Sequence, residues 1–268
     1  MKNIVISIGC SFTEGVGCYN KVALKEFQKG NVSDAELLMK SYPNMLAGCI
    51  GTLIAKEMGY LYHYNYGRGG KSIKQQLDMF YKDCNKFDFF KENVFIYLGV
   101  TYPNRSSTFI NGITKVIHES DIRSGEFYKE QKSELLNLDI ISNQAVYINS
   151  LLNISILQNI PTIVDFMDYS KHNESIYRKV LLNENDYSNI KYVFKDRNMY
   201  LDKTDYAYCG HPNQYGYKKW AGWIFDEIEH MSVQIHKESN NVFCKSIDNN
   251  TKIELLNNNQ FNIIQKHS

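Results

Sequence analysis

The chain has 268 residues, of which 43% are hydrophobic and 22% charged, and its formal net charge is +1. This composition is typical of a globular protein, and the length suits one large α/β domain with insertions or at most two small domains. A net charge near zero without a basic block argues against a nucleic-acid partner. No stretch approaches the roughly 18 apolar residues of a membrane span, so we expect no membrane association.

The start of the chain leads directly into an apolar run that is too short for a signal peptide and has no small-residue cleavage site. The six cysteines are scattered without a C-x-x-C pair, which is typical of reduced thiols, and the seven histidines are scattered too. We therefore expect a cytoplasmic protein, or a part of a larger particle, that needs neither a metal nor an organic cofactor.

The first apolar run, residues 4–8, has the β-branched character of a buried strand and stops at Gly9. A strand that ends in a glycine presents the following side chains at the carboxyl edge of a sheet, where open α/β sheets carry out their chemistry. Ser11 is the residue presented here, and a serine hydroxyl is a suitable nucleophile. Nearby glycines let backbone N–H groups approach an oxyanion.

Other interpretations of this turn are open. Ser11 can simply cap the helix that follows, and Gly-x-Ser after a strand is often only a tight turn. A phosphate-binding loop is disfavoured, because the stretch has neither the G-x-G-x-x-G spacing nor a Gly-Lys-Ser/Thr ending, and Glu14 would repel a phosphate.

The rest of the chain alternates between strand and helix patterns. We predict strands at 4–8, 61–64, 94–98 and 161–166 with a weak fifth at 193–194, and helices at 44–58, 72–84, 140–157, 176–182 and 214–231. This order predicts an α/β fold with a mainly parallel five-stranded sheet covered by helices. The loops after three of the strands should then meet at one carboxyl edge.

We divide the chain into an α/β domain at residues 1–231, with insertions at about 18–40 and 106–135, and a C-terminal extension at 232–268. Apolar clusters in the Asn-rich extension suggest short strands rather than plain disorder. We expect residues 240–268 to pack against the domain or a partner chain, which makes an oligomer or a larger assembly conceivable. The side chains expected to be buried there are Phe243, Ile253, Leu255 and Phe261.

Four short blocks in chain order carry a resemblance to a known family. They are Gly9-Cys10-Ser11-Phe12-Thr13, the run from Asn65 to Ser72, Leu98-Gly99-Val100-Thr101, and His211-Pro212-Asn213. Together they resemble the sequence blocks of the SGNH (GDSL-like) hydrolase superfamily, over about residues 3–105 and 205–231. No single block is specific, but four blocks in order at suitable intervals form a fairly strong signal.

The resemblance implies a three-layer α/β/α, flavodoxin-like fold and a serine esterase that acts on small acyl esters. O-acetylated carbohydrate is the leading substrate. By the same resemblance, Ser11 attacks the ester carbonyl and His211 takes its proton. The N–H groups of Ser11 and Gly70 would hold the oxyanion together with Thr101. Tyr102, Asn104, Arg105 and the polar insertion after them are candidate substrate-facing parts, because loops at this edge set specificity.

The third block departs from the family pattern, because Thr101 stands where the family keeps an asparagine that donates to the oxyanion. A threonine hydroxyl also donates one hydrogen bond but reaches less far. Asn104 or Arg105 could contribute in its place.

The last block also departs, because Tyr208 stands where the family keeps the aspartate that orients the histidine. Asp205 is our candidate for a displaced third member of the triad. One alternative is Asp202. Another is a backbone carbonyl that orients His211 in a Ser–His dyad. Both departures also fit a non-catalytic binding or structural protein on the same fold, within a larger, viral or cell-surface, assembly.

Overall fold

A computed structural model describes residues 2–100, 105–110, 113–118, 133–167, 170–196, 201–231, 233–236, 241–246 and 253–257 of the chain. In this part of the protein, no helix is both long and apolar enough to cross a lipid bilayer.

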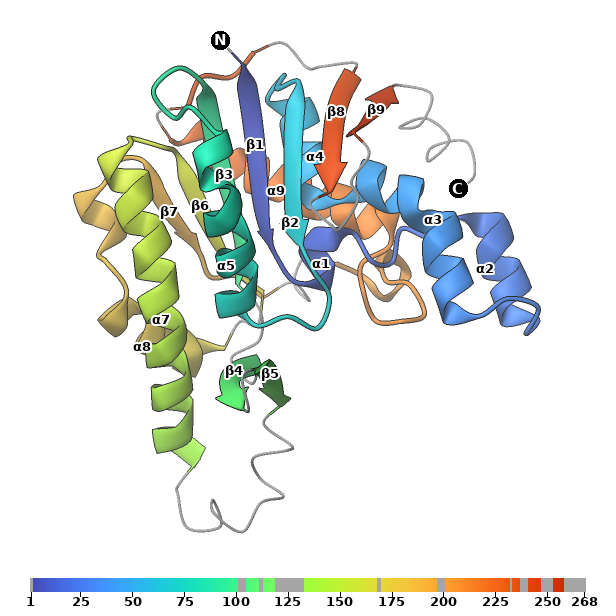
Figure 1. Cartoon of the computed structure of the whole chain (residues 1–268), viewed down its shortest axis with the longest axis horizontal. Coiled ribbons are helices and arrows are strands. Elements are labelled where there is room, and N and C mark those ends of the chain that lie inside the picture. The colour runs from blue at the N-terminus through green and yellow to red at the C-terminus, as the bar shows by residue number, and fades with distance from the viewer. Residues whose placement is uncertain are drawn as a thin grey trace.

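A seven-stranded sheet in the order β7-β6-β3-β1-β2-β8-β9 forms the centre of the fold (Figure 1). All neighbouring strands are parallel except β8 and β9, which are antiparallel. The strands are β1 (Asn3–Gly9), β2 (Tyr62–Gly67), β3 (Asn93–Val100), β6 (Thr162–Phe166), β7 (Ile190–Val193), β8 (Asn241–Ser246) and β9 (Ile253–Asn257). The five predicted strands are therefore present, and the C-terminal segment adds two more.

Helices lie on both faces of the sheet, as the predicted three-layer fold requires (Figure 1). The helices are α1 (Ser11–Glu14), α2 (Lys21–Gln28), α3 (Asp34–Gly48), α4 (Ile50–Glu57), α5 (Ile73–Asp83), α7 (Ser133–Leu157), α8 (Lys171–Val180) and α9 (Gln214–Glu229). Short 3-10 helices are η1 (Cys84–Lys86), η3 (Glu184–Asp186) and η5 (Lys203–Asp205).

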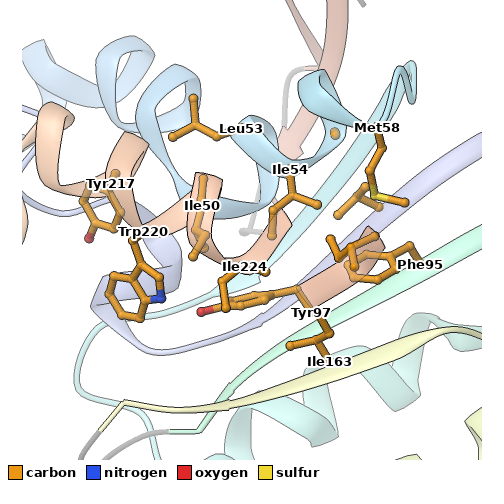
Figure 2. Close-up of a cluster of buried hydrophobic side chains, with 14 of the residues drawn as sticks. Ile50, Leu53, Ile54, Met58, Phe95, Tyr97, Ile163, Tyr217, Trp220 and Ile224 are labelled. Atoms are coloured by element: carbon orange, nitrogen blue, oxygen red, sulfur yellow. The ribbon is translucent and has the colours of Figure 1, made fainter. Parts of the chain in front are cut away.

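Strand β1 shows why both faces need cover. Its side chains alternate, so that Val5 belongs to the core under α4 and α9, whereas Ile4, Ile6 and Ile8 belong to the core under α5 and α7. Figure 2 shows the first of these cores, where helix residues such as Ile54 and Ile224 lie over strand residues such as Phe95.

The predicted start of one helix at Asn44 is wrong. Helix α3 begins at Asp34, because the Ser33 side chain and Glu36 form a reciprocal capping box there. The helix continues through Pro43 and ends at Gly48. Cys49 is extended and separates α3 from α4. The Ser33–Glu36 signal lies within residues 18–40, for which the sequence predicts a polar insertion.

The second insertion contains a β-hairpin. Strand β4 (Arg105–Ile110) pairs antiparallel with β5 (Ile113–His118) in a separate two-stranded sheet. In Figure 1 this hairpin lies beyond the carboxyl ends of β1 and β3.

The C-terminal strand β8 pairs in parallel with β2, and its Val242 and Cys244 side chains are buried. Phe243 is half-buried and stacks on Tyr62 with ring centroids 5.5 Å apart. The side chains of Ile253 and Leu255 on β9, and all of Phe261, lie outside the described residues.

Truncation after His236 should lower the melting temperature by several degrees. It removes two buried apolar side chains of β8, each of which contributes on the order of 2 kcal/mol, and leaves β2 as an exposed edge. Thermal unfolding of the full and truncated chains measures the difference. An unchanged melting temperature would show that β8 adds nothing to the stability of the sheet.

Candidate active site

Strand β1 delivers Ser11 to the carboxyl edge of the sheet. The strand ends at Gly9, Cys10 takes the N-cap position, and Ser11 is the first residue of the one-turn helix α1. A side chain at Gly9 would collide with Thr13 and with the carbonyl of Gly99, so the tight turn needs glycine. Ser11 is 7% exposed, and it is not the N-cap residue of this helix.

The imidazole of His211 lies directly beside this serine, with Nε2 at 2.7 Å from Ser11 Oγ. The loop that carries it is braced by a hydrogen bond from the Ala207 N–H to the His211 carbonyl. Gly17 packs so closely on this loop that a side chain there would collide with the carbonyl of Pro212. The two side chains, 200 positions apart in the sequence, are therefore in direct contact at one edge of the sheet.

Aromatic rings fix the position of the histidine. The centroid of the Phe12 ring lies 4.6 Å from the centroid of the imidazole. It lies 6.3 Å from the centroid of the Trp220 ring of α9, and these two rings are in a T-shaped arrangement. Trp220 in turn donates from its indole N–H to Asp165 at 2.9 Å, and the same carboxylate oxygen accepts from Tyr97 at 2.6 Å. Burial and the adjacent carboxylate hold the pKa of Tyr97 well above its ordinary value, so Tyr97 stays a hydrogen-bond donor.

Asp205, our candidate for the third member of the triad, has a different role. Its carboxylate is 4% exposed, accepts the Asp202 N–H at 2.8 Å, and pairs with Lys219 at 2.6 Å. No hydrogen bond joins this carboxylate to His211 in the described part of the chain. The residue sits in the short helix η5, where it closes a capping box with Asp202 rather than facing the histidine.

Tyr208, which replaces the family's aspartate, is turned toward the first insertion. It stacks on Tyr19 and on Phe27 of α2, with centroids 5.4 Å apart in both pairs, and it remains 53% exposed. Partial burial raises the pKa of its hydroxyl. Tyr208 thus packs against α2, and it offers no carboxylate to the histidine.

The loop after β2 passes over Ser11. Its Gly67 N–H donates to the Asn65 side chain at 2.7 Å, and its Arg68 N–H donates to the Gly9 carbonyl at 2.8 Å. Gly70 has a φ of +72°, a left-handed conformation that favours glycine. The backbone N–H groups of Ser11 and Gly70 make no hydrogen bond to another described residue, so both can donate to a ligand.

Beneath this loop lies a buried polar network that fixes Asn65. The His63 ring contacts Ser7 Oγ at 2.7 Å through Nε2 and Thr52 Oγ1 at 2.8 Å through Nδ1. Ser7 donates to Asn65 Oδ1 at 3.3 Å, and Cys244 of β8 lies 3.3 Å from His63 Nδ1. A fully satisfied buried network of this kind holds the loop in one conformation.

Three predicted site residues, Thr101, Tyr102 and Asn104, lie outside the described residues. Arg105 opens β4, and only its backbone is described. The sequence assigns Asp165 to loop solvation and Trp220 to the apolar face of a helix, and it offers Glu14 only as a reason against phosphate, so none of the three is predicted as a site residue. The described residues hold no group of three or more side chains suited to a metal ion.

Structural comparison places this architecture among known folds. The chain matches a carbohydrate esterase whose active site displays divergent catalytic and non-catalytic binding functions, with a TM-score of 0.54 and 16% identity, over 86% of this chain and 65% of that one. It also matches an acetyl xylan esterase from the rumen bacterium Butyrivibrio proteoclasticus, with a TM-score of 0.48 and 12% identity, over 85% of this chain and 63% of that one.

A lipolytic protein of the G-D-S-L family from Desulfitobacterium hafniense matches with a TM-score of 0.43 and 12% identity, over 84% of this chain and 98% of that one. No protein-family model and no curated protein matches the sequence. The chain spans less than two thirds of the two esterases named above. The chain shares with the carbohydrate esterase an α/β fold with a mainly parallel sheet between two layers of helices, which is the fold that the resemblance to the SGNH (GDSL-like) hydrolases implies.

Proposed function

We propose that the protein is a serine esterase that hydrolyses small acyl esters. The observation that supports this most directly is the 2.7 Å contact between Ser11 Oγ and His211 Nε2 at the carboxyl edge of the sheet. A nucleophile within hydrogen-bond distance of a base is the arrangement that acyl transfer requires.

In the proposed reaction, Ser11 Oγ attacks the ester carbonyl while His211 Nε2 accepts the hydroxyl proton. The tetrahedral oxyanion receives hydrogen bonds from the Ser11 and Gly70 N–H groups, with Thr101 as a further proposed donor. His211 then returns the proton to the leaving alcohol, and an acyl-serine remains. Water, activated by the same imidazole, hydrolyses the acyl-serine and restores the free serine.

We propose O-acetylated carbohydrate as the substrate class. A carbohydrate esterase is among the proteins with a similar fold, which supports a carbohydrate ester as the substrate. Tyr102, Asn104 and Arg105 are proposed to face the substrate, because they connect the carboxyl end of β3 to the β4–β5 hairpin.

The first test compares hydrolysis rates of the wild-type protein on a chromogenic acetyl ester, its butyryl homologue and an acetylated xylo-oligosaccharide. We expect turnover of both acetyl substrates, with the butyryl ester slower because the proposed substrate class carries acetyl groups. Background rates on all three substrates would remove the esterase proposal.

A second candidate function, carbohydrate binding without turnover, is favoured by the contacts of the Asp205 carboxylate, which joins Lys219 and the Asp202 N–H and, among the described residues, makes no hydrogen bond to His211. One protein of similar fold is described by both catalytic and non-catalytic binding functions. Binding of acetylated oligosaccharide measured by calorimetry, combined with background hydrolysis, would support this candidate and contradict the esterase.

Substitution of Asp205 by asparagine should lower kcat less than tenfold. The carboxylate contacts Lys219 and the Asp202 N–H, and an asparagine oxygen can still accept from that N–H. If the aspartate instead oriented His211, the loss would approach about 10⁴, as in a serine-protease triad. Steady-state kinetics of the purified variant separate the two outcomes.

A further inference from the structure

A glutamate in the nucleophile turn reaches across to the oxyanion loop. Glu14 is the last residue of α1, one helical turn after Ser11. Its Oε2 accepts the Gly69 N–H at 2.8 Å, and its Oε1 accepts the Arg68 guanidinium at 3.0 Å. Both side chains are largely buried, with 21% of Glu14 and 12% of Arg68 exposed. Charge-assisted bonds of this kind are shorter and stronger than neutral ones.

These contacts complete a series along the loop backbone. The N–H groups of Gly67, Arg68 and Gly69 donate in turn to the Asn65 side chain, to the Gly9 carbonyl and to Glu14. The next N–H, that of Gly70, has no acceptor among the described residues, and a side chain at Gly70 would meet nothing within 4 Å. Three consecutive donors are therefore fixed, and the fourth is left for a ligand.

The distances also show why Glu14 can set the position of this donor. A Cβ added to Gly69 would lie 3.3 Å from Ser11 Cβ and 3.4 Å from Glu14 Oε2, so this segment passes directly over the serine. Arg68 balances the carboxylate charge, which would otherwise disfavour a developing oxyanion nearby.

We infer that Glu14 is a positioning residue that fixes the Gly67–Gly70 loop, so that the Gly70 N–H donates to the oxyanion formed on Ser11. The inference rests on the proposed esterase function and adds a residue to it. Glu14 does not touch the substrate. It acts through the loop backbone, and its effect falls on the transition state because the oxyanion exists only there.

The test measures kcat, KM and amide hydrogen exchange in Glu14→Ala and Glu14→Gln. A single oxyanion donor is worth about 10²–10³ in kcat, so partial misplacement of Gly70 should lower kcat of Glu14→Ala by roughly 10–100-fold with KM nearly constant. The Gly69 amide should exchange faster with solvent in this variant. Glu14→Gln keeps an acceptor oxygen and should recover most of kcat and of the protection.

The matched control is Glu174→Ala, which breaks an ion pair with Arg178 on α8 and should leave kcat unchanged. If Glu14→Ala does not fold, Glu14→Asp replaces it, since its carboxylate is one methylene short of Gly69, and it should show the same loss of kcat. Wild-type kcat in the folded variant, an effect on KM alone, or unchanged exchange at Gly69 overturns the inference. A wild-type protein without esterase activity instead overturns the proposed function.

Discussion

Replacement of Ser11 by alanine should lower ester hydrolysis by roughly 10⁴-fold or more, to a rate near background. The hydroxyl oxygen forms the bond to the acyl group, and no neighbouring side chain can substitute for it: Cys10 is fully buried and its Sγ contacts Met167. His211→Ala should be comparably damaging, because the two side chains act as one unit through their 2.7 Å contact. The double variant should therefore be no slower than either single variant.

Ser150→Ala is a suitable control, because this serine of α7 is exposed and its hydroxyl, among the described residues, donates to the Val146 carbonyl of its own helix. It should retain wild-type kcat and KM. Circular dichroism and thermal unfolding should show all four variants folded. Retention of more than a tenth of the wild-type rate by Ser11→Ala would mean that another group carries the reaction.

Substitution of Trp220 by alanine should produce the largest loss of stability, about 3–5 kcal/mol in the free energy of unfolding. The side chain is 1% exposed and lies in the core under α9, as Figure 2 shows. Its removal leaves a cavity beside Tyr217 and takes away the donor to the buried carboxylate of Asp165. It also removes the ring that packs against Phe12, so the imidazole of His211 should be held less firmly beside Ser11.

Urea unfolding of the variant, followed by tryptophan-independent far-UV circular dichroism, measures this loss. Phe90→Ala is the matched control, because it also removes an aromatic ring but from a position that is 86% exposed, and its stability should change by less than about 0.5 kcal/mol. A Trp220 variant as stable as the control would show that the core does not depend on this residue.

The sheet could be predicted because its central strands are buried on both faces and therefore read as unbroken apolar runs. Residues 94–98 are such a run, and β3 forms there. The edge strands are less apolar, and the sequence therefore predicts β7 only weakly. The partner of β8 cannot be predicted from local pattern, because β8 pairs with a strand some 180 residues earlier in the chain. Helix α3 begins at Asp34, ten residues before the predicted start at Asn44, because the capping box of Ser33 and Glu36 starts the helix there.

The contact between Ser11 and His211 could be predicted, because each residue lies in one of the four sequence blocks. A parallel sheet brings the loops that contain these blocks to one edge. The role of Asp205 could not, since its orientation depends on Lys219 of α9, a contact that no local pattern reveals. For Glu14, the sequence indicates only a negative charge that would repel a phosphate. Its function as an acceptor for Gly69 depends on how closely two glycine-rich turns pass each other, which only the three-dimensional structure shows.

The contact of Ser11 with His211 also has a consequence for biosynthesis. During synthesis the histidine follows the serine 200 residues later. Closure of so long a loop makes the site a product of late, non-local folding. A nascent or C-terminally shortened chain that ends before His211 cannot therefore carry this pair of side chains, and the proposed esterase activity would require synthesis at least up to this residue.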